Sequence, residues 1–168
     1  MHAVRKVLDR VLATSCVALF AILVFTVVWQ VVARQVLNDA SAWSEELAKV
    51  VFVWLGMFGA ALVFSERGHI AVDFAVRLLP ESGQRMIAVV VQLAIIGFAA
   101  VALVWGGWRA SELAWEQNLT GLPTQIGKIY LVMPITGVII TFYAIYHVIS
   151  VLRREEPAVE HDDIAEAI

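Results

Sequence analysis

The chain has little of what membrane-bound oxidoreductases and haem proteins need. Its 168 residues include one cysteine, Cys16, and four histidines, of which only His147 lies in a long uncharged segment. A single cysteine excludes an intrachain disulfide and the paired thiols of a quinone-linked disulfide oxidase. One histidine within the apolar segments excludes a haem held between two facing histidines. We therefore expect no enzyme activity and no catalytic, metal or cofactor-binding residues.

Charge is also scarce. Only 16% of the residues are charged, and 12 basic against 15 acidic residues give a net charge of −3. No basic cluster is long enough to follow a phosphate backbone, so the chain lacks an electrostatic basis for binding nucleic acid. Hydrophobic residues make up 61% of the sequence, well above the roughly 45–50% apolar share of soluble domains. The composition excludes an ordinary soluble globule.

Four long uncharged segments account for this composition. They predict membrane-spanning helices at about 11–33, 47–65, 86–108 and 129–152, lengths that suit a hydrocarbon core of about 30 Å. The second uncharged segment is the shortest, so we expect Leu47 and Ala48 to extend it and Lys49 to reach toward the headgroups. The predicted fold is an all-α integral membrane protein, with a four-span domain over 1–152 and an acidic cytoplasmic tail over 153–168.

The basic residues indicate how the chain is oriented in the membrane. Eight Lys and Arg residues fall on the side of the two termini and the second connection, and four fall on the opposite side. Because Lys and Arg are enriched in cytoplasmic segments, we expect both termini in the cytoplasm. Five tryptophans fall near the outer surface, where amphipathic rings favour the membrane interface; they are Trp29, Trp43, Trp105, Trp108 and Trp115.

Two of the connections have an amphipathic pattern. Ile70, Phe74 and Leu78 recur every four residues and are followed by Pro80, which predicts a short helix on the cytoplasmic membrane surface. Aromatic and charged residues are mixed over 108–119, and this mixture predicts a second interfacial helix on the outer side.

Two carboxylates, Glu45 and Glu46, precede the second span. Neighbouring helical residues point about 100° apart, so these side chains are poorly placed to share a proton. We expect Ser44 to cap the helix, the acidic residues to complement its dipole, and Glu45 to pair with Lys49 one turn later. Direct contact with a partner protein is compatible with these local roles.

Small residues in the second span and a polar pair after it are further candidates. Gly56 and Ala60, with Gly59 beside them, allow another helix to approach closely, and the pattern leaves open whether that helix belongs to this chain or to a partner. His69 and Asp73 offer one nitrogen and one oxygen, too few ligands for a metal site of their own. We expect them to form a hydrogen-bonded pair that orients the second connection.

The order of these motifs resembles the small membrane subunit, of DctQ type, of tripartite ATP-independent periplasmic (TRAP) transporters. The resemblance covers nearly the whole chain except its two ends. It rests on Arg34, W-S-E-E-L-A at 43–48, V-W-L-G at 53–56, G-A at 59–60, G-H-I-x-V-D at 68–73, L-P at 79–80, G-L-P at 121–123, Tyr130 and M-P-I at 133–135. The W-x-E-E-L and G-H-I-x-V-D blocks at this spacing are its most specific part.

The resemblance implies a three-part uptake system in the bacterial inner membrane. A periplasmic solute-binding protein captures a carboxylate or related organic acid, and a large multi-span membrane subunit moves this solute with sodium ions by an elevator-like motion. The small subunit is implied to lie among membrane lipids and brace the fixed scaffold of the large subunit, with its outer face helping to dock the binding protein. Structural or interface roles are expected for Arg34, Trp43, Glu45, Glu46, Gly56, Gly59, His69 and Asp73.

The residues alone leave a second possibility, a self-associating membrane protein that transports or senses a solute without a large subunit. Such a protein would depend on Gln30, Gln92 and the tyrosines as its polar groups. Charged groups at depth usually mark transport paths through membranes, and the uncharged segments contain no Asp, Glu, Lys or Arg and one histidine, His147. An autonomous transporter is therefore the weaker of the two hypotheses.

Overall fold

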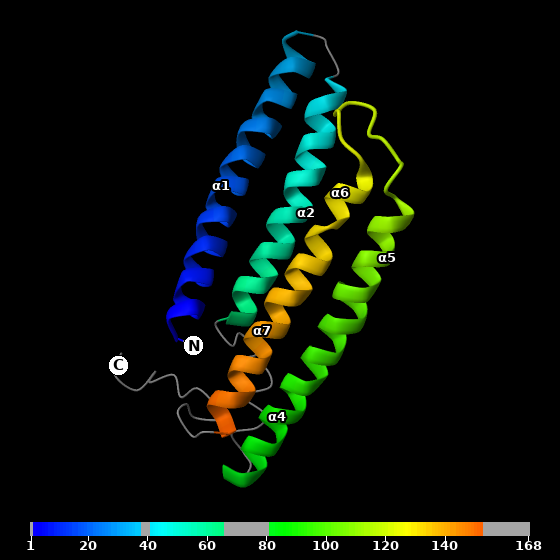
Figure 1. Ribbon diagram of the computed structural model, residues 1–168. Coiled ribbons are helices and arrows are strands. Elements are labelled where there is room, and N and C mark those ends of the chain that lie inside the picture. Colours follow the sequence, from blue (N-terminus) through cyan, green and yellow to red (C-terminus); the bar gives the residue numbers. More distant parts are fainter. Residues whose placement is uncertain (1, 38–40, 66–80, 153–168) are drawn as a thin grey trace, which may run out of the picture.

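The computed structural model describes residues 2–37, 41–65 and 81–152 of the chain (Figure 1). The described part is helical, and four of its helices are long and apolar enough to cross a membrane. This confirms the predicted fold class. The expected amphipathic helix after the second span and the acidic tail over 153–168 lie outside the described residues.

Each expected span lies within a longer helical segment. The first is α1 (His2–Gln35) and the second is α2 (Ala42–Ser65). The third consists of α4 (Glu81–Phe98), the π-helical segment η1 (Ala99–Trp105) and α5 (Gly106–Leu113). The fourth consists of α6 (Ile126–Tyr130) and α7 (Val132–Leu152).

The helix α7 lies at the centre of the arrangement. It packs between α2 on one side and the third span on the other, while α1 packs mainly along α2 (Figure 1). The buried core draws on all four spans through Leu12, Ala61, Ala99, Ile140 and Tyr143. We call the end with the α1–α2 connection and the α5–α6 loop the upper end, and the end with the N-terminus the lower end (Figure 1).

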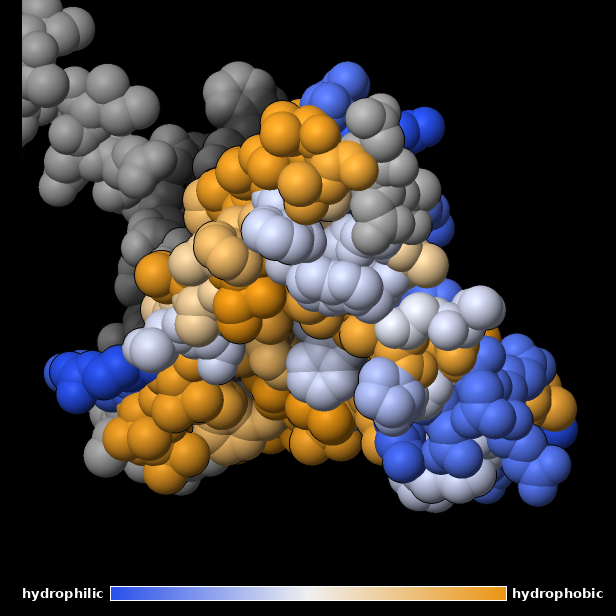
Figure 2. Space-filling view, turned by 90° about the horizontal axis from the view of Figure 1, so that it is seen from above, coloured by the Kyte–Doolittle hydropathy of each residue, from blue (hydrophilic) through white to orange (hydrophobic). Residues whose placement is uncertain are grey.

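Much of the remaining helix surface consists of apolar side chains. Seen from the upper end, hydrophobic side chains form large parts of the molecular outline, and hydrophilic ones gather in patches at its edge (Figure 2). On α1 the side chains of Val17, Phe20 and Phe25 are each more than half exposed. A water-soluble monomer rarely exposes an apolar surface of this extent, whereas lipid or another membrane helix can cover it.

The third and fourth spans approach each other closely at two glycines. A Cβ atom on Gly107 would lie 2.6 Å from Met133 Cβ, and one on Gly137 would lie 2.8 Å from both Leu103 Cβ and Val104 Cγ2. The first of these contacts is at the start of α7, where Pro134 stands in the first turn and its missing N–H costs little. The second contact is with η1, so the π-helical segment and α7 are packed backbone to backbone.

The structure differs from the expected second interfacial helix. Residues 108–113 continue the third span as the end of α5, and residues 114–125 form a loop. Backbone hydrogen bonds close this loop, from Leu119 N to Thr124 O at 3.0 Å and from Ile126 N to Gln117 O at 2.8 Å. Trp108 therefore belongs to the membrane helix itself, whereas Trp115 lies in the loop, and the helix ends at Leu113.

Candidate subunit interface

At the upper end, Glu46 fastens the α5–α6 loop to the start of α2. Its Oε1 accepts a hydrogen bond from Thr120 N at 3.0 Å, and its Oε2 accepts one from Gly121 N at 2.7 Å. A Cβ atom on Gly121 would lie 2.7 Å from backbone atoms of Ala42 and Trp43. Only a glycine fits there, so the G-L-P motif and the W-x-E-E-L motif form one packed unit.

The other polar residues at the start of α2 have local roles. Glu45 Oε1 and Lys49 Nζ are 2.6 Å apart on the exposed surface, which confirms the expected pair. The expected cap at Ser44 is wrong, because α2 begins at Ala42 and places Ser44 inside its first turn. The Ser44 hydroxyl instead donates to the carbonyl oxygen of Ser41 at 2.9 Å.

Two further predicted interface residues flank this region at the surface. Arg34 is exposed in the last turn of α1, where its positive charge complements the helix dipole. The Trp43 side chain is also exposed, at 42% of its area. Neither side chain is buried in the core of this chain, so both are accessible at the upper end.

A groove of about 410 Å³ lies beside Glu46, between α2 and the α5–α6 loop with α6. Its walls combine hydrocarbon from Val53 and Ile129 with the polar groups of Glu46, Lys49 and Asn118. We call it the upper groove. It is open at the surface, and its α2 wall continues toward the middle of the span.

Below the upper groove, one face of α2 has no neighbour in the described part of the chain. A Cβ atom on Gly56 or Gly59 would meet nothing within 4 Å. Exposed residues at helical spacing run along this side, and we call them the open face of α2: Phe52, Val53, Gly56, Ala60 and Val63. Gly56 and Gly59, predicted to permit close helix packing, thus contact no other helix among the residues that the structure describes.

The remaining predicted residues, His69 and Asp73, lie outside the described residues, so the structure does not place them. Among the residues that are described, no three His, Cys, Asp or Glu side chains gather in a way that could hold a metal ion.

A polar cluster at the lower end joins three helices. Asp9 Oδ1 accepts hydrogen bonds from Ser65 Oγ at 2.5 Å and from Tyr143 Oη at 2.6 Å. Arg5 donates to the carbonyl oxygen of Ser65 at 2.7 Å, lies 3.8 Å from Asp9, and places its guanidinium 5.3 Å from the ring centre of Tyr146. We call these five residues the Asp9 cluster, and it ties α1 to α2 and α7.

The sequence pattern does not single out the Asp9 cluster, because Asp9 stands among the basic residues that precede the first span. The available signal is the spacing of Arg5 and Asp9, which puts opposite charges on one helical face next to an apolar segment. The hydrogen-bond partners of Asp9 are 56 and 134 residues away in sequence, and that of Arg5 is 60 residues away. Only the packed helices reveal those contacts.

These features define the class of the protein. It is a four-helix membrane protein whose helices are joined by hydrogen bonds at both ends, and a face of α2 with small residues has no neighbour in the described part of the chain. A family model for the DctQ component of tripartite ATP-independent periplasmic transporters matches residues 23–154. The chain belongs to this family of small permease subunits, as the motif resemblance indicates.

Two full-length relatives carry names of the same kind. Over 153 residues the chain is 25% identical to the sialic acid TRAP transporter small permease protein SiaQ of Vibrio cholerae, covering 91% of this chain and 88% of that one. Over 153 residues it is 29% identical to a putative TRAP transporter small permease protein of Haemophilus influenzae, covering 90% and 91%.

A third relative is much longer than this chain. Over 95 residues the chain is 34% identical to the sialic acid TRAP transporter permease protein SiaT of Haemophilus influenzae, and this alignment covers 56% of the present chain but only 15% of SiaT. A segment similar to this small subunit therefore lies within a much longer permease chain.

Proposed function

We propose that this chain braces the scaffold of a large TRAP membrane subunit through the open face of α2. That subunit would carry out sodium-coupled uptake of a carboxylate or related organic solute delivered by a periplasmic binding protein. The observation that carries the proposal is that a Cβ added at Gly56 or Gly59 would meet no atom within 4 Å in the described part of the chain, apart from the local backbone of α2 itself. In lipid, small residues favour helix association because they let two backbones approach closely.

The rigid attachment of the helices supports a bracing role. Glu46 holds the loop at the upper end, and the Asp9 cluster joins three helices at the lower end. Close contacts at Gly107 and Gly137 join the third and fourth spans. A scaffold must keep its shape while another domain moves, and these connections limit the relative motion of the four spans.

The relative SiaT supports the choice of partner. Because a segment similar to this chain is part of one longer permease polypeptide in SiaT, the two components are covalently joined there and must lie within reach of each other. In the present protein the same association would have to come from surface contacts. The open face of α2 and the exposed Arg34 and Trp43 are the surfaces available for it.

The distribution of charge supports assigning the transport step to the large subunit. The segments 11–33, 50–65, 86–108 and 129–152 contain no Asp, Glu, Lys or Arg, and ions or charged solutes crossing a membrane usually meet such groups. The solute class rests on the relatives named for sialic acid, which is a carboxylic acid. Both termini are proposed to be cytoplasmic, because the basic residues are more numerous on their side.

Co-purification of the tagged full-length chain with the large subunit encoded by the same genome tests the proposal. We expect a one-to-one complex by native mass spectrometry. Proteoliposomes that contain both subunits should accumulate radiolabelled sialic acid or succinate only with the binding protein and an inward sodium gradient. A homo-oligomer of this chain without a large subunit would contradict the proposal, as would full uptake by the large subunit alone.

A further inference from the structure

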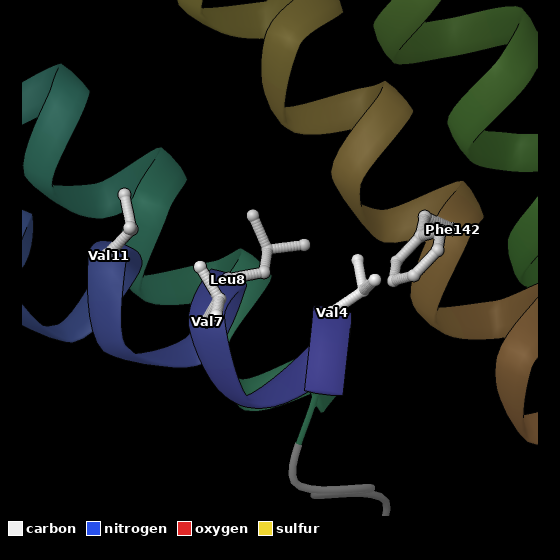
Figure 3. Close-up of a pocket in the computed structure, with 5 residues that line it drawn as sticks. All are labelled: Val4, Val7, Leu8, Val11 and Phe142. Atoms are coloured by element: carbon white, nitrogen blue, oxygen red, sulfur yellow. The ribbon is translucent and has the colours of Figure 1, made fainter. Parts of the chain in front are cut away.

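Grooves of similar volume lie at the two ends of the described chain, and they differ in charge. The one at the lower end, of about 430 Å³, is lined by hydrocarbon, with Phe142 of α7 pointing toward valine and leucine side chains of α1 (Figure 3). Such walls do not distinguish one apolar occupant from another. The upper groove, of about 410 Å³, contains the charged side chains of Glu46 and Lys49 in its lining. It therefore selects an occupant by charge as well as by shape.

The two charged side chains of the upper groove differ in what they bind. Lys49 Nζ lies 2.6 Å from Glu45 Oε1, so its charge is already matched. Glu46 accepts hydrogen bonds from the amides of Thr120 and Gly121, and it forms no ion pair with any residue that the structure describes. An ionised carboxylate has about four acceptor positions, so part of the acceptor capacity of Glu46 remains for a further donor.

Hydrocarbon borders this carboxylate on two sides. Val50 and Val53 belong to the α2 wall of the groove, and Ile126 and Ile129 belong to its wall on α6. Glu46 itself is half-buried. Arginine and lysine place a long hydrocarbon stem against apolar surface and carry their charge at its end. A basic side chain therefore matches both the walls and the carboxylate.

The upper groove adjoins the surface proposed for the large subunit. Val53 belongs both to the groove and to the open face of α2, and Lys49 stands on the same side of the helix, seven residues before Gly56. A partner helix that packs at Gly56 therefore lies beside the groove where it reaches the upper end of α2. The exposed Arg34 of this chain lies on α1 and is not part of the groove lining.

We propose that the upper groove holds an arginine or lysine side chain of the large subunit, with its hydrocarbon stem between α2 and α6 and its charged group on the Glu46 carboxylate. This inference rests on the proposed function, because the partner helix on the open face of α2 supplies the side chain. It adds an ion pair at the upper end to the small-residue contact at Gly56. Complementary charges across an interface fix the register in which two surfaces pack.

Photo-crosslinking in the assembled transporter identifies the occupant. The full-length chain carries a photo-crosslinking amino acid in place of Asn118, which is exposed and lines the groove. We expect it to label the large subunit next to an arginine or lysine. A label on phospholipid, or on a segment of the large subunit without a basic residue, would overturn the proposal.

Charge reversal tests the ion pair. Glu46→Arg should weaken the complex with the large subunit about tenfold, because two cations then face each other in a site that the partner shields from water. Replacing the labelled basic residue of the large subunit with glutamate should restore the yield of the complex with Glu46→Arg. A loosened α5–α6 loop cannot explain this restoration, since Glu46 is missing from both complexes.

Two further variants complete the experiment. The matched control Glu112→Arg makes the same change of charge at an exposed position of α5, and it should leave assembly unchanged. If Glu46→Arg does not fold, the labelled basic residue of the large subunit is changed to glutamine instead. This change leaves the present chain intact, and it should also weaken the complex about tenfold.

The outcomes separate this inference from the proposed function. If Gly56→Leu weakens the complex but Glu46→Arg assembles fully, or if the exchanged charges do not restore assembly, a helix of the large subunit covers the open face of α2 and no basic side chain occupies the groove. The inference is then wrong and the proposed function stands. If the wild-type chain retains no large subunit, both are wrong.

Discussion

At the scale of single residues, two neighbouring glutamates have very different roles. Glu46 holds two backbone amides of the α5–α6 loop, whereas Glu45 forms an exposed pair with Lys49. Hydrogen bonds to a charged group contribute about 1.5–3 kcal/mol when well shielded, and exposed ion pairs contribute about 0–1 kcal/mol. The partly exposed site of Glu46 is expected to lie near the lower bound of the first range.

Glu46→Ala should therefore loosen the loop while Glu45→Ala should not. We expect the amides of Thr120 and Gly121 to exchange about tenfold faster in Glu46→Ala, which corresponds to about 1.4 kcal/mol. Hydrogen–deuterium exchange in detergent measures this directly. Equal protection of the loop in both variants would show that the two hydrogen bonds do not hold it.

The Asp9 cluster gives a second prediction at this scale. Asp9→Ala removes the acceptor for Ser65 and Tyr143 and the charge opposite Arg5, so we expect a loss of about 2 kcal/mol in unfolding free energy. Thermal unfolding in detergent should show a clear drop in midpoint. Lys128→Ala, which changes one exposed charge, should leave the midpoint unchanged.

A double-mutant cycle tests whether Asp9 acts through the Tyr143 hydroxyl. The effects of Asp9→Ala and Tyr143→Phe should fall short of additivity by about 1 kcal/mol, since each change removes the same hydrogen bond. Additive effects would mean that Asp9 stabilises the chain in another way.

Local patterns predict some of these residue roles and not others. The Glu45 and Lys49 pair is predictable because it depends only on a four-residue spacing. The cap at Ser44 is mispredicted because α2 begins two residues earlier, at Ala42. Gly121 packs against the backbone of Ala42 and Trp43 at this point. A contact between residues nearly 80 positions apart leaves no local trace in the sequence.

At the scale of elements, the third and fourth spans depend on glycine for their close approach. Gly137→Ala would place a Cβ 2.8 Å from atoms of Leu103 and Val104, so we expect a loss of about 1–3 kcal/mol from overpacking. Gly97→Ala is the matched control, because a Cβ there meets nothing within 4 Å. Unfolding of the isolated chain should therefore shift to lower temperature for Gly137→Ala alone. A similar fall in both variants would show that the contact with η1 is not its cause, since alanine by itself favours the helix over glycine.

The four membrane helices are predictable because uncharged length is itself the physical requirement for spanning a bilayer. The division of the third span is not predictable, since the apolar sequence at the end of α4 continues into η1 without a break and the two segments differ there in hydrogen-bond register. The end of α5 at Leu113 is set by the loop contacts with Gln117 and Ile126 rather than by a change in periodicity. Of the expected helix over 108–119, residues 108–113 therefore continue the span and residues 114–119 belong to the loop.

At the scale of the whole molecule, the surface divides into parts that this chain covers and parts that it leaves open. Substitutions at Gly107, Gly121, Gly127 and Gly137 would collide with neighbouring atoms, while those at Gly56, Gly59 and Gly97 would not. Glycine generally weakens a helix relative to larger residues. Uncovered glycines therefore have no evident benefit for the isolated chain. Gly56 is followed four residues later by Ala60, a small-residue spacing that favours a partner helix, whereas Gly97 is followed by Val101, so a benefit in a complex is expected for Gly56.

Gly56→Leu should separate folding from assembly. The isolated variant should unfold at the wild-type temperature or above it, because a Cβ at position 56 meets nothing within 4 Å in the described part of the chain and leucine favours helix. Its complex with the large subunit should be weakened about tenfold, since the leucine prevents the close approach of a partner helix. Gly97→Leu, on an exposed face of α4, should leave assembly unchanged.

Co-purification yield and sodium-dependent uptake are measured for both variants beside the wild type. Full yield and full uptake in Gly56→Leu would show that lipid, and not the large subunit, covers the open face of α2, whereas a loss in both variants would move the interface beyond α2.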